Sequence, residues 1–241
     1  MVRVCFFLLV ISHVGVCQQQ NSISRRKTSL GISFSPEFCY RSLRYGDDVH
    51  WISDERNSRE LPATGFTTGL NVRYLFRDDL SVDAGILYSD KSYRNRAEAL
   101  TWIVQDPSLP ATSEVTIHYQ TIEIPLKAYY YFPRKQGRLK AFVTAGLAAN
   151  VFLARRTALR IKYPDGHDVR QASAAELGYT AATFGMSVGA GVLYKCSARW
   201  DVKIEPHYKR SLTSIVNAHD SREFLFSFGV EAAVYYSFLR K

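Results

Sequence analysis

The chain has 241 residues, a formal net charge of +9, and 46% hydrophobic and 22% charged residues. This composition excludes an intrinsically disordered chain and a bundle of membrane-spanning helices. The positive charge would suit a nucleic acid, but the basic residues lie in short turns or alternate with apolar ones, so we expect no nucleic-acid partner.

The first predicted element is a secretory signal peptide at residues 1–17. A single basic residue, Arg3, precedes a mostly apolar run over residues 4–16 that is too short to span a bilayer. Small residues at the end of this run predict cleavage between Cys17 and Gln18. The alternative, in which Cys17 becomes a lipidated N-terminus, stays open at this point.

After the signal peptide we expect a periplasmic N-terminal segment over residues 18–28 and one β-barrel domain over residues 29–241. In residues 30–41 the even positions are apolar or aromatic, and the odd positions are Gly, Ser, Cys or charged. Such alternation places the two sets on opposite faces of a β-strand. The same pattern predicts further strands within residues 66–76, 80–88, 115–132, 141–151, 184–194, 200–208 and 224–238.

The fourth predicted strand, residues 115–132, changes the phase of its alternation. Ile117 and Tyr119 are apolar at odd positions, whereas the apolar residues from Ile122 onward occupy even positions. One extra residue near Gln120–Thr121 would restore the register, as a β-bulge does. We therefore expect a bulge there that keeps the apolar side chains on one face.

The predicted connections alternate between long and short. The long ones span residues 42–62, 92–113, 155–180 and 211–222. The short ones span residues 77–79, 133–138 and 196–199. Eight strands joined in this way are typical of an antiparallel transmembrane β-barrel with short periplasmic turns and long extracellular loops. The fold class we predict is therefore all-β, an eight-stranded outer-membrane barrel.

Two sets of residues on the polar face predict that this face lines the lumen. The first consists of glycines, which a narrow lumen needs because it is only just wide enough for side chains: Gly31, Gly65, Gly69, Gly85, Gly185, Gly189, Gly191 and Gly229. The second consists of charges of both signs, which could neutralise one another inside: Glu37, Arg73, Asp83, Glu123, Lys127, Lys203, Glu205 and Glu231.

Aromatic residues gather at the strand ends, as expected at the two membrane interfaces. The predicted periplasmic girdle contains Phe76, Tyr130, Phe132, Tyr194, Trp200, Tyr236 and Phe238. The predicted extracellular girdle contains Tyr40, Phe66, Tyr88, Phe184, Tyr208 and Phe224. Together with the lumen residues, they predict that outward positions such as Leu70 face lipid.

Four stretches together resemble the PorT-like outer-membrane β-barrel family. The most specific is Ile122–Tyr130, which is similar to that family's LEIPLLLKY strand. The others are Gly69–Phe76 leading into Leu80–Ser89, Gly189–Val192 and Phe228–Val230. The resemblance implies an outer-membrane location and a barrel fold. It implies no shared catalytic residues, and some members of the family are linked to protein export and gliding.

The sequence predicts no catalytic, cofactor-binding or metal-binding residues, and we expect a non-enzymatic protein. It has no phosphate-binding glycine loop and no paired-cysteine metal spacing. The expected role is structural or accessory, with binding through the extracellular loops. Two alternatives remain: a small-solute pore, or a lipid-modifying enzyme using residues near the outer rim, namely His118, His207, Ser211 and Glu223.

The expected partners are outer-membrane lipids, the barrel-assembly and periplasmic chaperone machinery, and an envelope protein. A basic collar is predicted at the periplasmic side, where anionic head groups lie: Arg25, Arg26, Lys27, Arg134, Lys135, Arg138, Lys195, Arg199, Arg240 and Lys241. We also expect Cys39 and Cys196 to remain unpaired, because about ten residues of roughly 3.3 Å each separate their levels in the barrel.

Overall fold

The structure is a computed structural model that describes residues 28–45, 50–103, 106, 108–132, 137–175, 179–216 and 221–238. The predicted signal peptide, residues 1–17, and all but the last residue of the segment 18–28 lie outside these ranges. Within the described ranges, no helix is both long enough and apolar enough to span a membrane.

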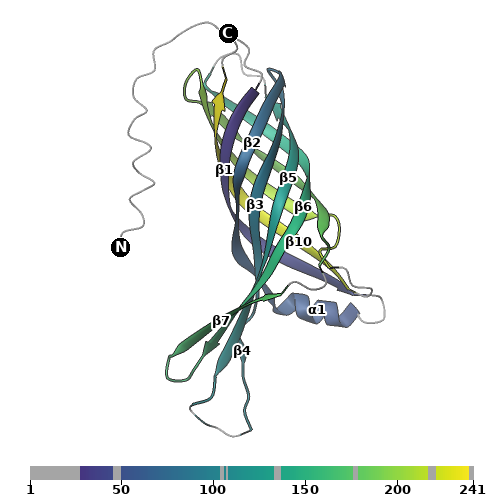
Figure 1. Ribbon diagram of the computed structural model, residues 1–241, viewed down its shortest axis with the longest axis vertical. Helices are drawn as coiled ribbons and strands as arrows, with labels where there is room; N and C mark the ends of the chain where they lie inside the picture. The colour runs from purple at the N-terminus through teal and green to yellow at the C-terminus, as the bar shows by residue number, and fades with distance from the viewer. Residues whose placement is uncertain are drawn as a thin grey trace.

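The chain forms a closed barrel with one helix, α1, beside the end from which β4 and β7 project (Figure 1). In chain order the elements are β1 (Thr28–Tyr45), α1 (His50–Arg59), β2 (Glu60–Arg77), β3 (Leu80–Asn95), β4 (Glu98–Ala99), β5 (Thr112–Tyr131), β6 (Leu139–Lys162), β7 (Asp168–Ala175), β8 (Ala182–Lys195), β9 (Trp200–Ser211) and β10 (Ser221–Ser237).

Eight of these strands close the wall through antiparallel neighbours, in the ring order β1-β2-β3-β5-β6-β8-β9-β10. The pairing of β10 with β1 joins the two ends of the chain, and the pairing of β5 with β6 completes the circle. Closure leaves no edge strand within the wall, as a spanning sheet requires. The predicted eight-stranded antiparallel barrel is therefore confirmed.

Beyond the wall, the sheet continues into an extracellular arm, which we define as β4, β7 and the outer ends of β3, β5 and β6. Figure 1 shows this arm projecting below and to one side of the barrel. The predicted loops 92–113 and 155–180 are thus wrong in part, because β4 pairs with β5 and β7 pairs with residues 155–162 of β6. The predicted loop 42–62 likewise contains α1 and the start of β2.

The two faces of the wall are as the sequence predicts. Along β1 every odd position from Gly31 to Cys39 is buried, whereas the even positions between them are exposed. Leu70 on β2 is 53% exposed, while its neighbour Asn71 is buried and donates a hydrogen bond to Ser33 Oγ over 2.7 Å. The apolar face therefore points outward, toward lipid.

The phase change in β5 has a different structure from the one expected. The register does shift between Gln120 and Thr121, but the partners of these residues are Ala154 and Phe152, so the extra residue, Leu153, belongs to β6. Ile117 and Tyr119 are buried inside the barrel and do not join the outward apolar face. At this level β5 has left the apolar band, and apolar side chains gain more by packing inside than by facing water.

The opposite rim is periplasmic and carries the short connections. Asp78–Asp79 joins β2 to β3, and residues 196–199 join β8 to β9. Of the predicted basic collar, only Arg138, Lys195 and Arg199 lie in the described ranges, and all three are at this rim. Exposed aromatic side chains surround the same level, among them Phe76, Tyr130, Phe132, Trp200 and Phe238.

Both cysteines in the described ranges are free thiols, as predicted. Cys39 is buried on the luminal side of β1, and Cys196 lies in the turn between β8 and β9.

Candidate functional site: a charged lumen and an extracellular trough

The lumen begins at its periplasmic end with an apolar cluster of Tyr129, Tyr131, Phe142 and Leu193. Above this cluster, the Arg73 Nε donates to Asp83 Oδ1 over 3.0 Å. The hydroxyl of Tyr235 donates to the other oxygen of Asp83 over 2.6 Å, and the Arg73 guanidinium lies 3.7 Å from the centroid of the Tyr235 ring. This end of the barrel is therefore filled by side chains.

The middle of the lumen holds a quartet of two lysines and two glutamates. Lys203 Nζ lies 2.7 Å from Glu205 Oε2 and 2.6 Å from Glu231 Oε1. Lys127 Nζ contacts the same two carboxylates at 3.2 and 2.8 Å. All four side chains are at most 5% exposed. Since β5, β9 and β10 contribute them, the quartet ties together strands from opposite parts of the sequence.

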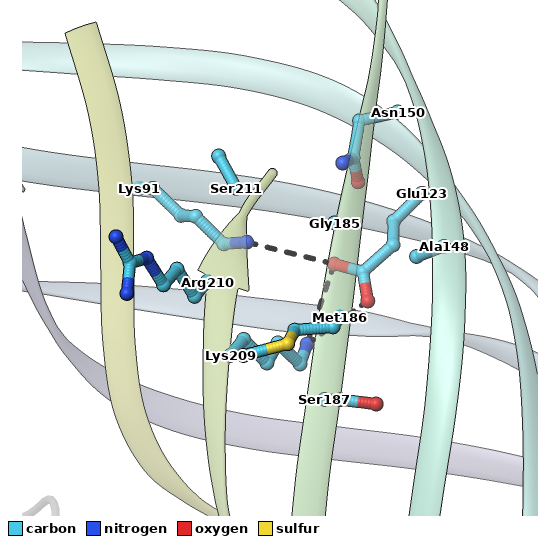
Figure 2. A pocket seen from close by; sticks show the side chains of 10 residues that line it. All are labelled: Lys91, Glu123, Ala148, Asn150, Gly185, Met186, Ser187, Lys209, Arg210 and Ser211. Carbon is cyan, nitrogen blue, oxygen red and sulfur yellow. Dashed lines mark hydrogen bonds and ion pairs between the residues drawn. The ribbon is translucent and has the colours of Figure 1, made fainter. Parts of the chain in front are cut away.

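A second group of ion pairs lies one level further out. Lys209 Nζ contacts Glu37 Oε1 at 3.0 Å and Glu123 Oε1 at 3.2 Å, and Lys91 Nζ approaches Glu123 at 3.8 Å. Figure 2 shows both lysines directed at the Glu123 carboxylate beside a small pocket. The pocket has about 10 Å³ of accessible space, enough for no more than one water molecule.

Two layers of side chains close the extracellular end of the lumen. Arg41 forms ion pairs with Glu60 and, at 2.8 Å, with Glu223, whose other oxygen accepts a hydrogen bond from Tyr119. Over these residues lies an apolar cluster of Tyr93, Ile117, Tyr119, Ile215 and Leu225. The lumen thus has an apolar plug at each end and paired charges between them.

Two luminal glycines show how little free space this filling leaves. A Cβ atom on Gly31 would lie 2.6 Å from the ring of Tyr235. On Gly191, a Cβ atom would lie 2.2 Å from the carbonyl oxygen of Ile204 in the neighbouring strand. Both contacts are far inside van der Waals distance, so these positions need glycine for packing.

One luminal group has the donor types of a metal site. Ligand atoms of Glu205, His207 and Glu231 lie within 4.8 Å of one another. Both carboxylates, however, are already paired with Lys127 and Lys203. A metal ion would have to displace or repel two ammonium groups, so these residues fit an ion-pair network better than a metal centre.

The four residues weighed for catalysis are not brought together. His118 lies on the outer face, where its Nδ1 is 2.9 Å from Asp90 Oδ1. His207 and Ser211 are buried in the lumen, and Glu223 pairs with Arg41. No hydrogen bond joins any two of these four residues, all of which the structure describes.

Sequence reasoning missed Glu60 and Lys91 as luminal charges. The sequence pattern puts Glu60 in the connection 42–62, although this residue begins β2 and pairs with Arg41. Lys91 lies just beyond the predicted end of the third strand. The signal for Lys91 was present, because the odd luminal positions of β3 continue through Ser89 to this residue.

A trough lies on the outer face, where the arm leaves the barrel. It has about 510 Å³ of accessible space and reaches from Phe38 on β1 to Arg170 on β7. Arg94, His118 and Arg160 lie along it. Arg160 donates hydrogen bonds to Asp168, and these bonds lower the pKa of that carboxyl.

Comparison with known proteins identifies a family to which this architecture corresponds. The sequence model of a family described as outer membrane protein β-barrel domain matches residues 19–217. No curated protein matches the chain in sequence.

Several solved structures that resemble the chain are bacterial outer-membrane proteins. Neisserial surface protein A is 16% identical, with 88% of this chain and 97% of that chain covered and a TM-score of 0.45. OprG from Pseudomonas aeruginosa is 11% identical, with 89% and 97% covered and a TM-score of 0.44. The protease OmpT from Escherichia coli is 12% identical, with 91% and 99% covered and a TM-score of 0.41. Such low values say nothing about activity.

Proposed function

Because the chain belongs to the outer membrane protein β-barrel domain family, we propose that it is a non-enzymatic membrane anchor that binds an envelope protein through its extracellular arm. The observation that carries this proposal is the filled lumen. A barrel of eight strands has an interior just wide enough for side chains. Here paired charges and two apolar clusters occupy that interior from one end to the other. This favours a closed anchor over the alternative of a small-solute pore.

The arm supports a binding role because it carries exposed apolar residues outside the lipid-facing band. Trp102 and Ile103, near the tip of the β4–β5 connection, are 44% and 105% exposed. Exposed apolar and aromatic side chains in water mark contact sites for other proteins. Against the alternative of a lipid-modifying enzyme stands the separation of His118 from His207 across the wall.

A photo-crosslinking residue placed at Ile103 should capture an envelope polypeptide in intact cells, because this side chain projects from the arm into water. The measurement is a mass shift of the protein on a denaturing gel, followed by identification of the attached peptide. The matched control is Ile86, which is 65% exposed on the lipid-facing wall and should yield no polypeptide adduct.

If the crosslinker at residue 103 captured no polypeptide under conditions where the protein is folded, the proposed binding role would be refuted. Ion conductance by the purified protein in planar bilayers would instead support the pore.

We also propose that the chain is exported through its first 17 residues and that it is a PorT-like protein linked to protein export. The Ile122–Tyr130 strand and its neighbours support that membership, and the apolar run after Arg3 supports the signal peptide. Outer-membrane lipids and the barrel-assembly and chaperone machinery are the further partners that this route implies.

Protein recovered from the outer-membrane fraction should have an intact mass that begins at Gln18, since a signal peptidase would remove residues 1–17. A mass that instead begins at an acylated Cys17 would establish the lipidated alternative. Retention of Met1 would refute both forms of processing.

A further inference from the structure

The outer trough lies at the level where the lipid-facing band ends. Along the outer face of β5, the side chains run from Leu126 through Ile124 and Ile122 to Gln120 and His118. The change from aliphatic to polar side chains marks the boundary between acyl chains and head groups. His118 is also a lining residue of the trough, so the trough begins where lipid head groups lie.

Its shape follows from the strands that line it. Phe38 on β1 and Arg170 on β7 lie along one trough, although β2, β3, β5 and β6 separate their strands in the sheet. The sheet must therefore be concave on its outer side between them. Figure 1 shows the corresponding projection of β4 and β7 to one side of the barrel axis. The outer face of the arm consequently lies across the trough from Phe38, which is 65% exposed.

The polar lining of the trough is mainly basic. Register pairs Glu114 with Arg160, and Arg160 with Arg170, so these side chains share one face. Arg94 adds a third guanidinium on the same side, 3.4 Å from Glu114. Among the described residues, Arg170 makes no ion pair.

The existing ion pairs would not prevent an anion from binding. The side chains of Arg94 and Arg160 are 47% and 40% exposed, and exposed ion pairs add little stability. A guanidinium can bind a phosphate through two parallel hydrogen bonds, in the same geometry in which it binds a carboxylate. Phosphate groups at the membrane surface could therefore take the place of Glu114 and Asp168.

From this placement, we propose that the trough binds the phosphorylated head group of an outer-leaflet glycolipid, with Arg94, Arg160 and Arg170 contacting the phosphate and Phe38 contacting the acyl chains. Binding there would hold the arm against the membrane surface and fix the direction in which its tip points. The proposal does not rest on the closed lumen or on a protein partner, so the tests of the two are independent.

The test titrates the folded full-length protein, in detergent, with lipid A, which is an acylated glucosamine disaccharide carrying phosphates. Native mass spectrometry counts the bound lipid. The variant R94Q/R160Q/R170Q should lose at least about tenfold in affinity, since three cations near an anionic head group are removed. The matched control R44Q/R56Q/R222Q changes the same charge on exposed residues outside the trough and should stay within about twofold.

Heat-modifiable migration on a gel shows that each variant has closed its barrel, and the single variant R170Q should weaken binding on its own. Equal affinity of the two triple variants would overturn the proposal. So would equal binding of dephosphorylated lipid A. Displacement of the lipid by inorganic phosphate at the same concentration would mark a free-anion site, and displacement by an acidic peptide would mark a protein site; either result rejects the glycolipid.

Discussion

Replacing Lys203 with Met is expected to lower the free energy of unfolding by about 3–5 kcal/mol, the cost of breaking a buried ion pair by removing one partner. Lys203 is 1% exposed, and its ammonium contacts Glu205, Glu231 and the hydroxyl of Tyr129. Without it, two buried carboxylates share only Lys127. Urea unfolding of the protein in lipid vesicles, followed by tryptophan fluorescence, measures the change.

A double variant separates the effect of leaving a buried carboxylate unpaired from the effect of lost packing. The double variant K203M/E231Q leaves Lys127 and Glu205 as a balanced pair, so it should be more stable than K203M alone. Lys195→Met is the matched control, because Lys195 is exposed at the periplasmic end of β8 and should change stability by no more than about 0.5 kcal/mol. If K203M and K195M unfolded at the same urea concentration, the quartet would have no role in holding the barrel closed.

The wall of the barrel could be predicted because lipid imposes one rule on every strand that crosses it. Outward positions such as Ile32 and Leu70 must be apolar, and inward positions such as Glu37 and Arg73 are free to be polar. Period-two alternation records this rule directly, so strand number and facing followed from the residues alone.

The arm could not be predicted in the same way, since it lies beyond the lipid-facing band. Residues 155–162 of β6 and residues 168–175 of β7 form a hairpin without a consistent apolar side. Ile117 and Tyr119 show the same limit from the other direction. Their apolar side chains are buried inside, as in a water-soluble protein. A few residues later the same strand carries its apolar side chains on the outside, as a membrane barrel does.

Which luminal charges pair with one another could likewise not be predicted from the sequence. Alternation places Lys127 and Glu231 on the luminal face, but it does not give their heights along the barrel axis. The heights depend on how far each strand is shifted against its neighbour, a property of the closed barrel. Lys127 and Glu231 come to lie 2.8 Å apart although β5 and β10 are not neighbours in the wall.

Substitutions can locate the point within β5 at which the lipid-facing band ends. Leu126→Lys is expected to lower the free energy of unfolding in vesicles by about 2–4 kcal/mol, because it places an ammonium group near the bilayer midplane. Leu126 is 59% exposed on the outer face, between Ile124 and Ala128. Leu70→Lys on β2, where Leu70 is 53% exposed on the outer face, should have a cost of the same size.

Gln120→Lys is the matched control, since it introduces the same side chain on the same face of the same strand. Residue 120 lies six positions from residue 126, about 20 Å along the strand at roughly 3.3 Å per residue. At that level the side chain of Gln120 already contacts Asp90 Oδ2 over 3.4 Å, so a lysine would gain an acidic neighbour in water. We expect no loss of stability at residue 120. A cost at residue 120 equal to that at residue 126 would mean that the lipid-facing band extends into the arm, and the trough would then lie among acyl chains where no phosphate could reach it.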